Sequence, residues 1–329
     1  MCLYYSTFFL FLQPGILYKL NNLLWCKSQK AVISHNFLLT QSCGCAMLIM
    51  LGGHQTDHFY VMLNFTFGRI HMIVKRDFTY SPKGKNRPLH IWLPDDYRET
   101  DTRYPVMYFF DGHNLFLNED ATYGKSWGFK EFLEGWDKDI ILVGIECGHE
   151  GQERLSEYLP YPATGYFGQF EPMGEATFRW IVEEIKPMID REYRTIPFRE
   201  CTAIGGSSMG GIMALYGAVH FNRWFSKAAC VSTAMGFCMP PLMADLERSQ
   251  VSPDTRVYLS WGTREAKKTH PERGDRSSPT YYNNKAVAER LRKAKAAVKM
   301  ECQVGGGHCE ADWEKLVPGF MTFLWQAKN

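Results

Sequence analysis

The fold is decided by the stretch Thr202-Ala-Ile-Gly-Gly-Ser-Ser208-Met-Gly-Gly-Ile-Met-Ala-Leu-Tyr216. It opens with an apolar run typical of a strand and closes with a small, apolar run typical of a helix. Between the two runs, Ser208 is flanked by Gly206 and Gly210, which leave room where a strand turns sharply into a helix. The pattern predicts a strained turn that holds Ser208 at the carboxyl end of a strand.

Other interpretations of this stretch fit less well. Ser207 lacks a small second flank, because Met209 occupies that position. A phosphate-binding loop needs Lys-Ser, Lys-Thr or Gly-x-Gly-x-x-Gly at the helix entry, and this stretch has none of them. The run Tyr123-Gly-Lys-Ser126 resembles the end of such a loop, but Glu119 stands where its first glycine belongs. Ser208 is therefore interpreted as a nucleophile.

From about residue 59 onward, short apolar runs alternate with amphipathic segments. The pattern predicts strands at 89–93, 105–110, 140–145, 201–204, 228–231, 256–260 and 298–304, and helices at 174–193, 210–219, 284–297 and 310–328. Such alternation implies right-handed β-α-β units. It predicts a mainly parallel central sheet with helices on both faces, and together with the turn at Ser208 this pattern indicates an α/β-hydrolase fold. The long segment 149–172 is predicted to form a wall or lid over a site.

The first 58 residues have a different composition, with many Phe, Leu, Tyr and Cys residues and few charges. They contain no uninterrupted apolar span of about 20 residues, so no stable membrane insertion is expected. A secretory or anchoring signal is the alternative: Lys27 and Lys30 precede an apolar run at 31–51, but His35, Asn36, Gln41 and Ser42 interrupt this run. We expect residues 1–58 to be a poorly ordered or wrongly included extension, and residues 59–329 to form the catalytic domain.

Charge and cysteine content argue against a nucleic-acid-binding protein and against a disulfide-stabilised protein. The chain has 37 Lys and Arg against 35 Asp and Glu, and the two signs are interspersed. This distribution is unlike that of a nucleic-acid-binding surface. Ten cysteines in 329 residues are too few for a disulfide framework. A reducing, cytoplasmic compartment is expected. The sequence leaves a homo-oligomer open.

A serine nucleophile needs a base, which is most often histidine. In an α/β-hydrolase the histidine comes last along the chain, and His308 follows the last predicted strand in a glycine-rich loop. The other histidines fit less well: His220 lies one helix beyond Ser208, His270 lies in a charged loop, and His113 follows an earlier strand. His308 is the predicted general base.

The third member of the triad must be a carboxylate that orients the imidazole. Glu265 lies between Ser208 and His308 in the chain, just after a predicted strand. Its competitors are Asp254, Glu272 and Asp275.

Acyl transfer also requires backbone N–H groups directed at the developing oxyanion. Met209 follows the nucleophile directly, and His113 lies in the sharp turn after the strand 105–110. These two residues are the predicted oxyanion donors. Asp111, Trp127, Tyr158 and Trp313 are the candidate pocket residues, although aromatic residues at this density more often belong to a core.

No cofactor or metal is expected. One candidate metal cluster in the sequence comprises Cys43, Cys45, His54 and His58, but their spacing fits no structural zinc pattern.

Several ordered motifs together resemble the putative esterase family, the esterase D-like branch of the α/β hydrolases. The motifs are Pro105-Val-Met-Tyr-Phe-Phe-Asp-Gly-His-Asn-Leu-Phe116, Arg154-x-x-Glu157-Tyr158, Gly206-Ser-Ser-Met-Gly-Gly211, Gly262-Thr-Arg-Glu265 and Gly306-Gly-His-Cys-Glu-Ala-Asp-Trp313. The resemblance covers about residues 85–327. It implies a triad of Ser208, Glu265 and His308, with Asp rather than Glu the common acid in relatives.

The sequence therefore predicts a serine carboxylesterase that acts on a small-molecule ester of a small or aryl acid. An acyltransferase with the same triad is the alternative within chemistry. A non-catalytic binding protein on a hydrolase scaffold is the alternative of another class.

Overall fold

In the computed structural model, residues 72–265 and 278–326 are described in full, and the strands upstream of residue 72 by their backbone. The upstream strands are β1 (Phe8–Phe11), β2 (Leu17–Leu20), β3 (Ile33–Ser34), β4 (Phe37–Leu38), β5 (Ala46–Gly52) and β6 (His58–Thr66). Strand β7 (Arg69–Arg76) continues into the fully described part. Glu272, Asp275 and His270 lie outside the described residues.

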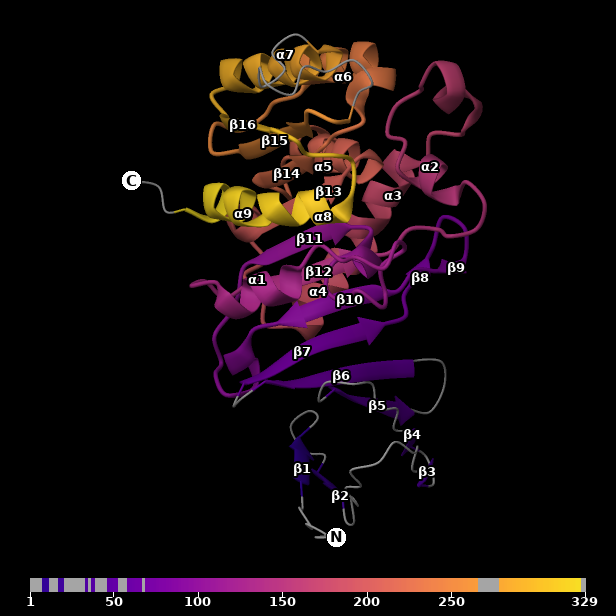
Figure 1. The fold of residues 1–329 in the computed structure, drawn as a ribbon, viewed down its shortest axis with the longest axis vertical. Coiled ribbons are helices and arrows are strands. Elements are labelled where there is room, and N and C mark those ends of the chain that lie inside the picture. Colours follow the sequence, from indigo (N-terminus) through magenta and orange to yellow (C-terminus); the bar gives the residue numbers. More distant parts are fainter. Residues whose placement is uncertain are drawn as a thin grey trace.

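A ten-stranded sheet with the order β16-β15-β14-β13-β11-β12-β10-β7-β6-β5 runs through the molecule (Figure 1). Its fully described strands are β10 (Leu89–Leu93), β11 (Val106–Phe110), β12 (Ile141–Ile145), β13 (Thr202–Ser207), β14 (Lys227–Val231), β15 (Arg256–Gly262) and β16 (Ala297–Gln303). Strands β11 to β16 pair in parallel, whereas β10, β7, β6 and β5 add antiparallel pairs on the β12 side. A separate hairpin joins β8 (Thr79–Tyr80) to β9 (Lys85–Asn86).

The longer helices are α1 (Phe129–Gly135), α3 (Gly174–Trp180), α4 (Lys186–Glu192), α5 (Met209–His220), α6 (Met239–Arg248), α7 (Pro279–Lys293) and α9 (Val317–Trp325). Shorter helical segments are α2 (Glu153–Glu157) and α8 (Glu310–Trp313). The 3-10 turns are η1 (Asp95–Arg98), η2 (Gly112–Asn114), η3 (Gly165–Gln169), η5 (Arg199–Cys201), η6 (Met235–Phe237) and η8 (Glu314–Leu316). A π-helical segment, η4 (Ile181–Ile185), joins α3 to α4.

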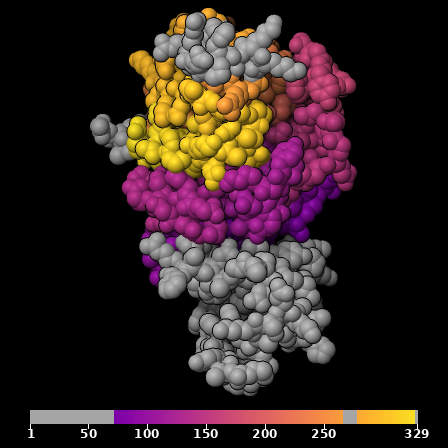
Figure 2. Space-filling view, viewed as in Figure 1, coloured from indigo at the N-terminus to yellow at the C-terminus, as the bar shows by residue number. Residues whose placement is uncertain are grey.

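Two hydrophobic clusters cover the two faces of the sheet. One cluster packs residues of α3, α4, α5 and α7 against one face, and the other packs residues of α1, α8 and α9 against the opposite face. In Figure 2 the C-terminal residues form a yellow band on the second face, beside the magenta residues of α1 and its neighbours. Strands β10, β11, β12, β13 and β15 are buried along their whole length, as expected for strands covered on both faces.

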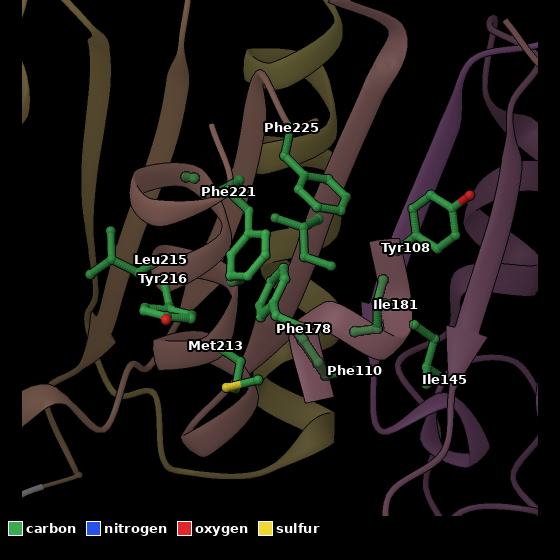
Figure 3. Close-up of a cluster of buried hydrophobic side chains, with 14 of the residues drawn as sticks. Tyr108, Phe110, Ile145, Phe178, Ile181, Met213, Leu215, Tyr216, Phe221 and Phe225 are labelled. Atoms are coloured by element: carbon green, nitrogen blue, oxygen red, sulfur yellow. The ribbon is translucent and has the colours of Figure 1, made fainter. Parts of the chain in front are cut away.

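Aromatic side chains fill the centre of the first cluster. The rings of Phe178 and Phe221 stack with centroids 4.8 Å apart, and Phe225 meets Phe178 edge to face at 5.9 Å. Phe178 also contacts Phe110 at the end of β11 (Figure 3). The helices on this face are thereby fixed against the strands that carry the candidate site.

The predicted α/β-hydrolase architecture is confirmed, with differences in detail. The helix predicted at 284–297 runs from Pro279 to Lys293, because the Ser278 side chain caps it by accepting from the Tyr281 amide at 3.0 Å. The helix predicted at 174–193 contains the π-helical segment η4, and the helix predicted at 310–328 divides into α8, η8 and α9. The segment 149–172 contains α2 and η3.

Among the described residues, none of the helices is both long enough and apolar enough to cross a membrane.

Candidate active site

The carboxyl ends of the parallel strands meet at one edge of the sheet, and the predicted site residues follow these ends. Strand β13 lies between β11 and β14, so the turn after β13 is flanked by the turns that follow its two neighbours. In open α/β sheets, ligands bind at this edge. Asp254 precedes β15 and pairs with Arg199 at the opposite edge, which removes it as a competitor for the triad acid.

Ser208 stands in the strained turn that the sequence predicts. Its φ of 56° and ψ of −117° lie in a region that residues other than glycine rarely occupy. Such a conformation costs about 1–3 kcal/mol and persists only where the surroundings enforce it. Here the Ser208 amide donates to the Val231 carbonyl at 3.0 Å, and the Ala234 amide donates to the Ser208 carbonyl at 3.0 Å.

The two flanking glycines are required by close backbone contact. A Cβ atom on Gly206 would lie 2.6 Å from the Gly210 carbonyl carbon, and one on Gly210 would lie 3.0 Å from Cβ of Phe110. Both distances are shorter than real Cβ contacts allow without movement of the neighbour. The Gly-x-Ser-x-Gly spacing therefore follows from how tightly β13 meets α5.

Helix α5 begins directly after Ser208. Every residue from Met209 to Val219 is buried, in keeping with a helix that is apolar on all sides. The amide of Met209 is one of the first four N–H groups of the helix, which have no acceptor within it. A partial positive charge at this end favours an anion.

Glu265 and His308 are in contact. His308 Nδ1 lies 3.6 Å from Glu265 Oε2, beyond a short hydrogen bond but within ion-pair distance. The Glu265 side chain is 11% exposed and that of His308 is 42% exposed. The carboxylate is thus fixed in the protein, while the imidazole faces the open edge of the sheet.

The loop that carries His308 is tied to the loop that carries Glu265. The Thr263 amide donates to the Gln303 carbonyl at 3.1 Å, and the Arg264 amide donates to the Gly306 carbonyl at 2.9 Å. A Cβ atom on Gly262 would lie 2.3 Å from the Gly306 carbonyl oxygen, so only glycine allows this approach. Because β15 and β16 are neighbours in the sheet, the two loops hold Glu265 and His308 together.

Ser232 was not identified from the sequence, yet it orients the Glu265 carboxylate. Its Oγ donates to Glu265 Oε1 at 2.6 Å and accepts from Trp313 Nε1 at 2.9 Å. The Gly262 amide donates to the same carboxylate oxygen at 2.7 Å. Ser232 follows β14 directly and has a positive φ of 47°. The one signal for Ser232 in the sequence was its position as a polar residue directly after the predicted strand 228–231.

No side-chain hydrogen bond joins Ser208 to His308 within the described part of the chain; His308 contacts Glu265 and, edge to face, the ring of Trp313. In enzymes without bound substrate, such nucleophile–base bonds are often long and tighten only in the complex.

The turn after β11 is held by buried polar contacts. Asp111 has a left-handed φ of 59°, and its amide donates to Tyr158 Oη at 3.1 Å. Arg154 donates to both carboxylate oxygens of Asp111 at 2.7 Å. Burial opposes ionisation of this carboxyl, but the Arg154 charge outweighs it and holds the pKa of Asp111 below its usual value. His113 follows in η2, where early amides lack an acceptor within the turn.

A second carboxyl lies beside the site. Glu310 is 7% exposed and accepts from Asn114 Nδ2 at 3.4 Å. Burial raises the pKa of Glu310, with a further contribution from the charge of Asp111.

The predicted aromatic pocket residues are largely covered. Trp127 is 1% exposed and packs between Phe109 and the stacked ring of Trp313. Tyr158 is 1% and Trp313 is 5% exposed. Their hydrogen bonds to the Asp111 amide and to Ser232 support a role in positioning the turns, and their burial favours the core interpretation over a pocket wall.

A strained serine at the carboxyl edge of a mainly parallel sheet covered by helices on both faces defines an α/β hydrolase. Solved structures share this fold. An IroE-like serine hydrolase from Shewanella oneidensis superposes with a TM-score of 0.60 at 18% identity, covering 78% of this chain and 82% of the other. The enterobactin esterase of Shigella flexneri, solved in the presence of enterobactin, gives 0.59 at 17% identity, covering 77% and 59%.

The chain belongs to the family described as "Putative esterase", which matches residues 81–324, and this membership identifies it as a carboxylic ester hydrolase. Curated relatives include the uncharacterized protein YbbA of Bacillus subtilis, 24% identical over 56% of this chain and 71% of that protein. An esterase of Mycobacterium tuberculosis is 30% identical over 46% of this chain. The match spans only 30% of that esterase's length.

Proposed function

We propose that the chain is a serine carboxylesterase in which Ser208 is the nucleophile, His308 the general base and Glu265 the acid that orients it. The observation that carries the proposal is the placement of Ser208 in a strained turn at the sheet edge where His308 and Glu265 are in contact. Each residue follows a different parallel strand, namely β13, β16 and β15.

In the first half of the reaction, His308 Nε2 takes the proton of Ser208 Oγ as this oxygen attacks the ester carbonyl carbon. The carbonyl π-electrons move to its oxygen, and a tetrahedral intermediate forms. Its collapse expels the alcohol, which receives the proton from His308. Water then attacks the acyl-enzyme by the same proton transfers, releasing the acid and restoring Ser208. Glu265, held by Ser232 and the Gly262 amide, stabilises the imidazolium in both halves.

The oxyanion is stabilised by the Met209 and His113 amides in this proposal. Both are early amides of helical segments, at the start of α5 and in η2. Strands β11 and β13 are paired neighbours, so the two turns lie side by side. The loss of one such donor typically lowers kcat by about 10²–10³-fold.

For the substrate, we propose a small-molecule ester of a small or aryl acid. The structural neighbours include a protein named as a ferulic acid esterase, with a TM-score of 0.55 and 17% identity. We also propose a cytoplasmic location, which is supported by the free thiols of the described cysteines, Cys147, Cys201, Cys230, Cys238, Cys302 and Cys309.

A fluorophosphonate probe tests the nucleophile. The unchanged chain and the Ser207→Ala control should be labelled on Ser208 and should hydrolyse aryl esters. Ser208→Ala should lose both properties while unfolding at the same temperature. Equal labelling of Ser208→Ala and the unchanged chain would refute the assignment.

A further inference from the structure

We propose that His113, Cys147 and His149 form a binding site for one zinc ion. The sequence predicts no metal. The three residues follow β11 and β12, which are parallel neighbours with Phe110 paired to Ile145. The pairing brings the turn after β11 and the segment after β12 together at the same edge of the sheet.

The ligand atoms are already close. One nitrogen from each histidine and the Cys147 Sγ lie within 4.8 Å of one another. The two imidazole rings meet edge to face with centroids 4.7 Å apart. Zinc bonds of about 2.0–2.1 Å to nitrogen and 2.3 Å to sulfur imply ligand atoms about 3.5 Å apart in a tetrahedron. Side-chain shifts of about 1 Å therefore close the site.

Hydrogen bonds hold both rings with one nitrogen free for the metal. His113 Nε2 bonds to Thr122 Oγ1 at 2.9 Å, and its buried Nδ1 has no hydrogen-bond partner in the described part of the chain. His149 Nε2 bonds to Glu146 Oε2 at 2.9 Å, which leaves Nδ1. A histidine whose second nitrogen bonds to a carboxylate is the usual arrangement at zinc sites, because it orients the ring and increases its basicity.

The remaining ligand is a buried thiol. Cys147 is 3% exposed. On binding, the S–H bond breaks, a sulfur–zinc bond forms and the proton passes to solvent. Three protein ligands leave the fourth position of the zinc ion to water.

The test uses the full chain, stripped with a chelator and then titrated with Zn²⁺ or Co²⁺. We expect one bound ion that depends on Cys147, and with Co²⁺ a thiolate-to-metal charge-transfer absorption. Cys147→Ser should abolish both signals. His149→Asn should weaken binding by at least about tenfold.

Control variants exclude other thiols and histidines. Cys201→Ser and His220→Asn remove similar side chains near the opposite edge of the sheet and should bind the ion unchanged. The joint variant Cys43→Ser with Cys45→Ser should also keep the absorption. A signal that survives Cys147→Ser, or disappears with Cys43 and Cys45, overturns the proposal.

Folding and catalysis are separated from metal binding by further measurements. Circular dichroism shows whether each variant is folded. If the Cys147→Ser variant does not fold, the His149→Asn variant tests the metal site instead. The His149 side chain is 54% exposed, so its replacement leaves the core intact. Ser208→Ala should bind the ion normally, so the metal site stands or fails independently of the proposed nucleophile.

Discussion

At the scale of single residues, the Ser232 hydroxyl fixes the orientation of the Glu265 carboxylate. Glu265 Oε1 accepts from the Ser232 hydroxyl and the Gly262 amide, which leaves Oε2 to face His308. Trp313 in turn donates to Ser232, so a buried indole holds the Ser232 hydroxyl against the Glu265 carboxylate.

Replacing Ser232 with alanine should therefore lower kcat by about 10–100-fold, because small misplacement of the catalytic groups is enough to cause this loss. KM should stay nearly unchanged, since Ser232 acts through Glu265 and not on the substrate. Steady-state kinetics on an aryl ester measures both quantities. Thr233→Val is the matched control, because the Thr233 hydroxyl has no hydrogen-bond partner in the described structure. A selective rise in KM would contradict this role.

Lys227 gives a prediction for stability. Burial lowers the pKa of its ammonium from 10.5 to about 8. Between pH 8 and 10.5 the unfolded chain binds a proton at this residue that the folded chain has released, so its contribution to stability increases with pH across that window.

Lys227→Met should remove this increase and raise the free energy of unfolding at pH 7. Denaturant unfolding of both chains at several pH values gives the difference curve. A difference that is flat from pH 7 to 10.5 would show that the lysine is not perturbed in this way.

At the scale of elements, the contact between β13 and α5 leaves no room for a side chain at Gly206. A methyl group on Gly206 would meet the Gly210 backbone, which no side-chain rotation relieves.

Gly206→Ala should destabilise the fold by about 1–3 kcal/mol, the range for overpacked interiors. It should also lower kcat at least about tenfold, because the serine turn must shift. Thermal unfolding and ester hydrolysis measure the two effects. Gly135→Ala, at the end of α1, has open space around its Cβ position and should change neither. Normal activity in Gly206→Ala would mean that the turn tolerates this shift.

At the scale of the whole molecule, the candidate site depends on the parallel half of the sheet. The site residues follow β11, β13, β14, β15 and β16, whereas β5 and β6 pair beyond β7 on the antiparallel side. We propose that residues 59–329 contain all of the catalytic machinery.

A chain that begins at residue 59 should accordingly fold and hydrolyse aryl esters with unchanged kcat/KM. Its far-ultraviolet circular dichroism and kinetics should be compared with those of the full chain. Loss of activity in a folded truncated chain would show that the first 58 residues contribute to the site.

The sequence by itself predicted strands β10 to β16, because apolar runs bounded by turn residues are typical of strands, but it did not predict helices α1 and α6. It also located Ser208, since only small flanking residues fit a sharp strand-to-helix turn. Only the tertiary structure showed that Ser232 hydrogen-bonds to Glu265 and Trp313. Only the tertiary structure showed that His113, Cys147 and His149 lie together at one edge of the sheet. Ser232, Trp313 and Glu265 are far apart in the chain, as are His113 and Cys147, and only the pairing of strands brings them into contact. No local pattern encodes such contacts, because they depend on the order in which strands assemble into the sheet.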